Sequence, residues 1–155
     1  MVDVRVADEE SDREAALAVR QRVFVAEQGV DPDLEVDEHD PDATHFVASD
    51  GEAAAGEAVG AARLRTLAAG TDDGTDVPRV GKVERVAVLA SRRGEGIGRQ
   101  LMDALEREAA AMGLETLTLH SQIHAAGFYE KLGYERSSDV FEEAGIPHVE
   151  MRKSV

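Results

Sequence analysis

The stretch "ASRRGEGIGRQLM", residues 90–102, places glycines at positions 94, 96 and 98 directly before an amphipathic run. A glycine-rich turn that opens a helix can bind an anion, because its backbone N–H groups have no helical partner and the helix dipole adds partial positive charge. Glycine also lets the backbone approach an oxygen atom closely. The stretch therefore predicts a phosphate-binding turn at the start of a helix.

Known phosphate-binding patterns can be tested against this turn. The dinucleotide pattern G-x-G-x-x-G requires a glycine where Arg99 stands, and the Walker pattern requires Gly-Lys-Ser/Thr, which the chain lacks. The pattern that fits is R-x-x-G-x-G, formed by Arg93, Gly96 and Gly98. Both nucleotide motifs are thereby disfavoured.

The hydrophobic pattern around the turn alternates between strands and helices. Strands are predicted at residues 2–6, 44–49, 58–67, 80–89, 115–121, 134–143 and 145–153. Helices are predicted at 11–24, where Ser11 and Glu14 form a capping box, at 95–112, and at 124–132. An acidic loop is expected over 25–44, a hairpin turn over 50–57 and a flexible connection over 68–79. This order predicts a mixed α/β sheet in one domain spanning residues 1–155.

Composition narrows the class of protein further. The chain has no cysteine, so disulfides and thiolate chemistry are excluded. Its 32 acidic and 17 basic residues give a net charge of −15, which disfavours nucleic acid and anionic membranes as partners. No apolar run reaches the ~20 residues of a membrane span, and no signal peptide is recognisable, so we expect a cytoplasmic protein. The acidity suggests adaptation to concentrated salt.

A family resemblance rests on several quoted segments. "VERVAVLASRRGEGIGRQLMDAL" (83–105) and "FYEKLGY" (128–134) resemble the acetyl-CoA-binding segment and the tyrosine-bearing helix of the GNAT (GCN5-related) N-acetyltransferases. "RQRVFVAEQ" (20–28), His45, "SQIHAAGFY" (121–129) and "VFEEAGIPHVEM" (140–151) resemble an ElaA-like subgroup. The resemblance implies an α+β GNAT domain with six to seven mostly antiparallel strands, about four helices, and two splayed parallel strands that form the acetyl-CoA slot.

The resemblance also implies which residues bind the co-substrate. The glycine turn would hold the pyrophosphate of acetyl-CoA, and the backbone of the preceding strand would pair with the pantetheine arm beside a bulge. An amide freed by that bulge would polarise the thioester. Gln122 stands where many members carry an asparagine that touches coenzyme A. The implied set comprises Val86, Ala87, Val88, Arg93, Gly94, Glu95, Gly96, Ile97, Gly98, Arg99 and Gln122.

Two catalytic roles follow. By resemblance, Tyr129 protonates the departing thiolate; the alternative is an ordinary helix aromatic. Glu84 is the first candidate for the base that deprotonates the amine, because strand alternation places it on one face with Val86 and Val88. Its alternatives are a solvated edge charge or a partner of Arg85. The rivals for the base are Glu27, His45, His120 and His148, and a chain of water molecules could also serve. These four residues are also candidates for binding the acceptor; the alternative is that they are structural residues.

Metal sites are not predicted. "DPDLEVDEHDPD" (31–42) spaces acids as an EF-hand does, but Val36 replaces the required glycine and Asp42 the final glutamate. His120 and His124 span a strand end and a helix start, which does not suit a zinc pair.

The resemblance thus implies an N-acetyltransferase. It would transfer acetyl from acetyl-CoA to a primary amine of a small molecule or peptide by direct attack in a ternary complex. The alternative is a non-catalytic sensor that binds acyl-CoA without turnover. Homodimers are common in the family, but no feature of this sequence defines an interface.

Overall fold

The computed structural model describes residues 2–51, 57–67 and 79–155. The predicted turn over 50–57 and the predicted connection over 68–79 lie mostly outside the described residues. In chain order the elements are β1 (Val2–Val6), α1 (Glu10–Arg20), η1 (Gln21–Glu27), α2 (Pro32–Glu35), β2 (Thr44–Asp50), β3 (Glu57–Thr66), β4 (Val80–Val88), η2 (Ala90–Arg92), α3 (Ile97–Ala111), β5 (Thr116–Gln122), η3 (Ile123–Ala125), α4 (Ala126–Lys131), β6 (Glu135–Arg136), β7 (Phe141–Glu143) and β8 (Ile146–Ser154).

The strands form one sheet in the order β1-β2-β3-β4-β5-β8-β6, with β7 also paired to β8. Among the described strands β4 and β5 pair in parallel, and every other pairing is antiparallel. The expectation of a single mixed, mostly antiparallel sheet is confirmed. The single strand predicted over 134–143 is two short strands, because the chain leaves β8 after Arg136 and rejoins it at Phe141.

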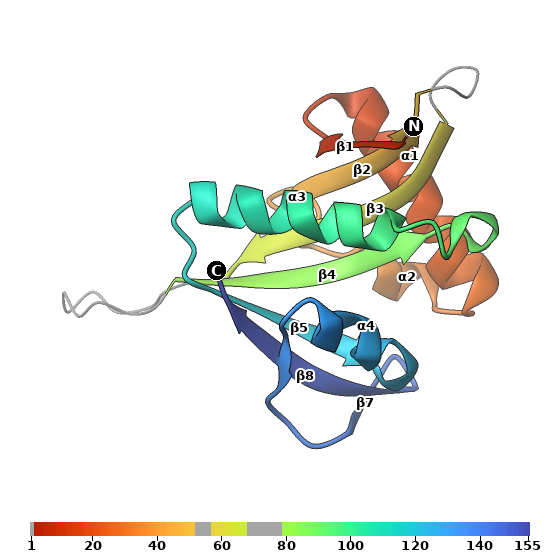
Figure 1. Ribbon diagram of the computed structural model, residues 1–155. Coiled ribbons are helices and arrows are strands. Elements are labelled where there is room, and N and C mark those ends of the chain that lie inside the picture. The colour runs from red at the N-terminus through yellow and green to blue at the C-terminus, as the bar shows by residue number, and fades with distance from the viewer. Residues whose placement is uncertain (1, 52–56, 68–78) are drawn as a thin grey trace.

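Helices cover both faces of the sheet (Figure 1). The long helix α3 and the short α4 lie on one face, while α1, η1 and α2 lie on the other. The apolar stripe of α3 packs against β3 and β4, with Leu101, Met102 and Leu105 buried. Because α3 joins β4 to β5, it is the crossover that makes this pair parallel.

The first helix differs from the prediction at both ends. The capping box at Ser11 and Glu14 is wrong: α1 begins at Glu10, its N-cap is Glu9, and no side chain caps it. The chain turns early because β1 ends at Val6 and Ala7 N donates to the backbone oxygen of His45. At the other end the helix continues beyond the expected Phe24 as the π-helical η1, in which Gln28 N donates to Val23 O.

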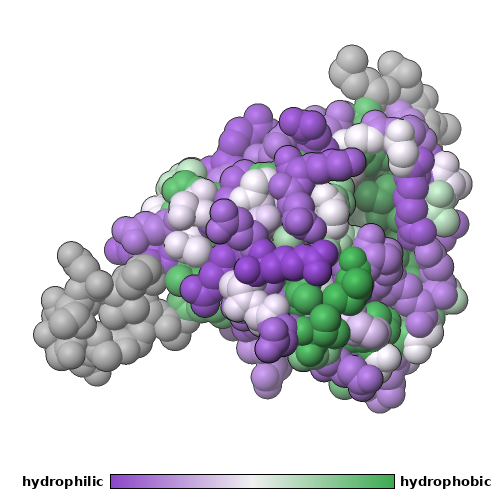
Figure 2. Space-filling model, turned by 60° about the horizontal axis from the view of Figure 1, so that its bottom comes forward, coloured by the Kyte–Doolittle hydropathy of each residue, from purple (hydrophilic) through white to green (hydrophobic). Residues whose placement is uncertain are grey.

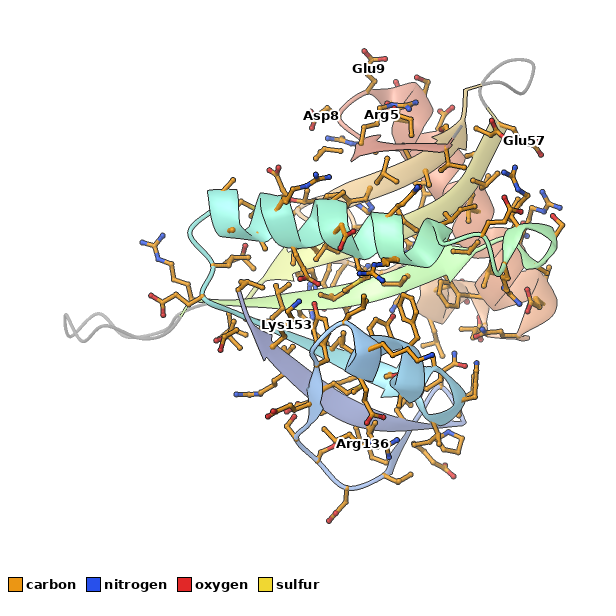
Figure 3. The ribbon with its side chains drawn as sticks, viewed as in Figure 1. Arg5, Asp8, Glu9, Glu57, Arg136 and Lys153 are labelled. Carbon is orange, nitrogen blue, oxygen red and sulfur yellow. The ribbon has the colours of Figure 1, made fainter. Side chains whose placement is uncertain are left out.

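Charged side chains cover the outside of the molecule. Figure 3 shows Arg5, Asp8 and Glu9 at one end and Arg136 at the opposite end. Most of the face in Figure 2 is hydrophilic, and apolar side chains gather on one part of it. No helix among the described residues is long and apolar enough to cross a membrane. The cytoplasmic location stays a prediction.

Candidate active site at the parallel strand pair

The two parallel strands separate along their length. They pair from Val80 to Val83 on β4 and from Thr116 to Leu119 on β5, and no pairing continues beyond those residues. The rest of β4, through Val88, therefore turns an unpaired backbone edge toward β5. A cavity of about 960 Å³ opens there. It is lined by residues from η1, α2, β4, β5 and α4, the glycine turn and the start of β8.

A bulge in β4 lies at this opening. Three steps along β4, from Glu84 to Ala87, match two steps along β3, from Arg63 to Ala61. The extra residue is accommodated at Arg85, which has φ 57°. A side chain in this left-handed region costs about 1–2 kcal/mol. The Arg85 guanidinium compensates by donating to the Leu34 and Glu35 carbonyls and to the carboxylates of Glu35 and Asp37.

The glycine turn fits an anion. Gly94 and Gly96 have φ 85° and 83°, and no atom lies within 4 Å of where a Cβ would stand on either. Gly96 is the N-cap of α3, which no side chain caps, so the N–H groups of its first turn have no partner in the helix. Gly98 has another role: its Cβ would stand 3.2 Å from Phe128 Cζ, so glycine allows α3 and α4 to pack closely.

Two arginines flank the turn and both are engaged. Arg93 donates to both carboxylate oxygens of Glu27 at 2.7 Å and to the Val88 carbonyl at 3.1 Å. This hydrogen-bonded pairing lowers the pKa of Glu27. Arg92 pairs with Glu95 at 3.0 Å, so the Glu95 side chain does not line the cavity.

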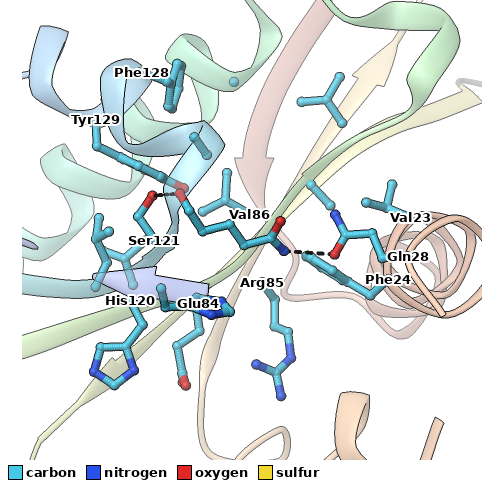
Figure 4. A pocket seen from close by; sticks show the side chains of 18 of the residues that line it. Val23, Phe24, Gln28, Glu84, Arg85, Val86, His120, Ser121, Phe128 and Tyr129 are labelled. Carbon is cyan, nitrogen blue, oxygen red and sulfur yellow. Dashed lines mark hydrogen bonds between the residues drawn. The ribbon is translucent and has the colours of Figure 1, made fainter. Parts of the chain in front are cut away.

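Tyr129 lies on α4 and lines the cavity (Figure 4). Its ring packs edge-on against Phe128 and Tyr134. The hydroxyl makes no hydrogen bond to any described residue, although it lies beside a cavity. Burial raises the pKa of Tyr129, so the phenol is protonated at neutral pH.

Glu84 lines the cavity on the α2 side. Arg63 and Arg65 donate to its Oε1 at 2.8 and 2.6 Å, and Lys82 Nζ lies 3.6 Å from its Oε2. Burial by itself would raise the pKa of Glu84, but these positive charges outweigh it and hold the pKa below its usual value. Such a carboxylate is a weak proton acceptor. Its partners are Arg63 and Arg65, and no hydrogen bond to Arg85 is formed.

The prediction that Glu84 shares a face with Val88 is wrong. Val88 pairs with Gly60 and lies 3.9 Å from the Cβ position of Gly98, so it faces α3. Glu84 pairs with Arg63 on β3. Because Arg63 and Gly60 are three residues apart on β3, they face opposite sides of the sheet, and Glu84 therefore faces α2. The bulge adds one residue between Glu84 and Val88, which reverses the alternation.

The candidate histidines separate into two groups. His120 and His148 line the cavity, whereas His45 lies outside it and is held by the Asp40 carbonyl at 2.8 Å. His120 Nδ1 lies 3.0 Å from Glu143 Oε1, and His148 Nδ1 donates to the Ile146 carbonyl at 2.6 Å. The ring of Phe141 contacts both.

The sequence comparison decides the family. A model described as "Acetyltransferase (GNAT) domain" matches residues 6–155. The chain belongs to the GNAT acetyltransferase family. The uncharacterized N-acetyltransferase YjcF of Bacillus subtilis is 40% identical over 149 residues, which cover 96% of this chain and 96% of that one.

Solved structures agree with this GNAT assignment. The crystal structure of Escherichia coli ElaA has a TM-score of 0.76 at 30% identity and covers 99% of both chains. That of Arabidopsis thaliana NAA60 in complex with acetyl-CoA has a TM-score of 0.79 at 13% identity, covering 100% of this chain and 99% of that one, and shows a shared fold. The resemblance to an ElaA-like GNAT domain is confirmed.

Sequence reasoning missed several residues that line the cavity of this GNAT domain, among them three polar ones that are placed by different elements. Gln28 follows η1, Arg85 forms the bulge, and Glu143 ends β7. The quoted segments at 20–28 and 140–151 contain two of them, but no local pattern assigns either to the cavity. Among the described residues no group of three or more histidine, aspartate or glutamate side chains is arranged to hold a metal ion.

Proposed function

We propose that this GNAT domain transfers an acetyl group from acetyl-CoA to a primary amine of a small molecule or peptide, by direct attack in a ternary complex. The observation that carries the proposal is one cavity that joins the open glycine turn, the unpaired edge of β4 and Tyr129. The solved structure of NAA60, which shares the fold, is in complex with acetyl-CoA.

The residues present suit the co-substrate. The uncapped N–H groups of residues 96–99 would hold the pyrophosphate, and Arg99 adds positive charge at the same rim. The unpaired edge of β4 at Val86, Ala87 and Val88 would bind the pantetheine amides through its backbone. When bound, acetyl-CoA supplies an acetyl thioester, whose carbonyl carbon accepts the amine and whose sulfur leaves as a thiolate.

Tyr129 is proposed as the proton donor to the thiolate. Its hydroxyl is protonated, makes no hydrogen bond to another described residue and lies at the cavity wall, so it has a proton that it can donate to a sulfur bound there. Tyr134, in contact with it, donates instead to Glu106 Oε2 and does not line the cavity. The two tyrosines thus provide a matched pair for experiment.

His120 is proposed as the proton acceptor in place of Glu84. Its Nδ1 lies 3.0 Å from Glu143 Oε1 and its Nε2 lies 3.7 Å from Glu150 Oε2, so in the tautomer that donates from Nδ1 to Glu143, Nε2 would accept the proton. Glu27 is engaged by Arg93, and His45 lies outside the cavity. We assign Glu84 to holding Arg63 and Arg65 in place on the α2 side of the cavity.

The experiment measures free-thiol release from acetyl-CoA across a panel of primary amines, together with acetyl-CoA binding by calorimetry. With the best amine, Tyr129→Phe should lower kcat by about 100-fold while the Kd for acetyl-CoA changes less than about twofold. Tyr134→Phe should retain activity. If the wild-type chain fails to bind acetyl-CoA, the proposal is wrong; if it binds but no amine releases thiol, the sensor alternative replaces it.

A further inference from the structure

A pair of glutamine amides crosses the cavity. Gln122 ends β5, Gln28 follows η1, and Gln122 Nε2 donates to Gln28 Oε1 at 2.9 Å. Both residues line the cavity and are partly buried. Figure 4 shows the Gln28 side chain in the cavity, with its hydrogen bond to the opposite wall drawn as a dashed line. We call this pair the amide bridge.

The amide bridge lies at the level of the β4 bulge. The last residues that pair β4 with β5 are Val83 and Leu119, so Val86 and Gln122 each lie three residues beyond the pairing. Val86 follows the bulge residue Arg85, so this register places the bridge where the thioester would be polarised under the proposed function. Beside Gln28, the buried Val23 and the half-buried Phe24 form an apolar wall on η1. Val30 and Leu34 extend the same lining toward α2. Apolar side chains therefore line the cavity around two amides that are bonded to each other.

Two amides that satisfy each other form a stable obstacle. An acyl chain that displaced Gln28 would leave the Gln122 donor without its acceptor in a partly buried place, which is unfavourable. A chain that found open space there would instead gain about fourfold in affinity for each buried methylene, since each contributes ~0.8 kcal/mol. With the bridge in place a longer acyl chain must displace Gln28, and without the bridge it would enter open space.

We propose that the Gln28–Gln122 amide bridge limits the length of the acyl group that this chain accepts from coenzyme A. This specificity role rests on the proposed acyl-CoA function. It makes acetyl the favoured group, although Val23, Phe24 and Val30 would otherwise accommodate a longer chain.

The test measures the Kd of acetyl-CoA, butyryl-CoA and hexanoyl-CoA by calorimetry, which requires no acceptor. In the wild type, affinity should fall at least tenfold from acetyl-CoA to hexanoyl-CoA. In Gln28→Ala the ratio of hexanoyl-CoA to acetyl-CoA affinity should rise at least tenfold. Gln122→Ala removes the donor from the opposite wall and should shift the ratio in the same direction.

Gln28→Glu is the matched control, because it keeps the length of the side chain and an oxygen that accepts from Gln122. Its ratio should equal that of the wild type, since any effect of the added charge is common to both ligands. Thermal melting establishes that each variant is folded. A folded Gln28→Ala or Gln122→Ala with the wild-type ratio would overturn the bridge proposal and leave the acetyltransferase proposal intact. A wild-type chain that binds none of the three thioesters would overturn both.

Discussion

At the scale of single residues, buried ion pairs hold the α2 side of the cavity together. Arg63 is fully buried and donates to Asp37, Asp40 and Glu84 at 2.7–3.0 Å. Arg20, equally buried, donates to Glu35 and Asp40. Each carboxylate is thus shared or closely paired. Removing one arginine would leave buried carboxylates without a compensating positive charge. The intact set contributes little net stability, because the cost of desolvating the charges offsets most of their attraction.

Arg63→Ala should therefore lower the free energy of unfolding by about 3–5 kcal/mol, measured by urea denaturation. Arg136→Ala is the control, because Arg136 is half exposed and pairs with Glu130 on the surface at 3.3 Å. Its loss should stay below about 1 kcal/mol. Equal losses for the two variants would contradict the assignment of Arg63 to a buried network.

The lowered pKa of Asp40 should make the free energy of unfolding depend on pH. Burial opposes its charge, but hydrogen bonds from Arg20, Arg63 and a backbone amide outweigh burial and hold the pKa of Asp40 well below its usual value. Because the folded pKa lies below the unfolded value of about 3.9, this contribution is full above about pH 5 and is lost as pH falls below about 4. Urea midpoints at pH 7, 5 and 3 should show the loss only at the lowest pH. Asp40→Asn should show a smaller loss between pH 5 and 3, and an unchanged pH dependence would count against this origin.

At the scale of elements, the packing of α3 on the sheet positions the glycine turn. Gly60 on β3 lies directly under this helix: an added Cβ would stand 2.9 Å from Leu101 Cδ1 and 3.2 Å from Ile97 Cγ2 and Ala87 O. Ile97 is the first residue of α3, and Ala87 lies in the part of β4 that pairs with β3 but not with β5. Both line the cavity, so close contact between α3 and β3 holds the start of α3 beside it.

Gly60→Ala should lower the free energy of unfolding by about 1–3 kcal/mol, because the added methyl group overpacks this contact. Gly127→Ala offers the opposite case, since Gly127 lies inside α4 with no atom within 4 Å of its Cβ position. That change should be neutral or stabilise by up to about 1 kcal/mol. A Gly60→Ala chain as stable as the wild type would show that α3 moves away from β3 without cost.

At the scale of the whole molecule, the net charge of −15 dominates. Like charges spread over the surface repel one another and oppose the folded state, and salt shortens the range of this repulsion from about 30 Å at 0.01 M to about 3 Å at 1 M. The buried arginine–carboxylate pairs are screened far less. Added salt should therefore raise the stability of the folded chain.

The melting temperature should rise between 0.01 M and 1 M KCl, by about 2–4 °C for each kcal/mol gained. Asp8 and Glu9 are exposed at the start of α1 (Figure 3), so the double variant Asp8→Asn/Glu9→Gln should show a smaller rise. A melting temperature independent of salt would contradict this account and the adaptation to concentrated salt that the composition suggests.

The sequence by itself determined the order of the longer strands and of α1, α3 and α4, the glycine turn and the tyrosine on α4. It missed α2, which lies in the predicted loop over 25–44, and the division of residues 134–143 into β6 and β7. The features that it determined depend on neighbouring residues, whose periodicity and backbone preferences are local. Only the tertiary structure decided which face Glu84 occupies, because one extra residue at Arg85 reverses the alternation of β4. It alone paired His120 with Glu143, and Gln122 with Gln28, 94 positions away. Contacts between residues so distant in the chain arise from the packing of η1, β5 and β7 around the separated strands, which no local pattern encodes.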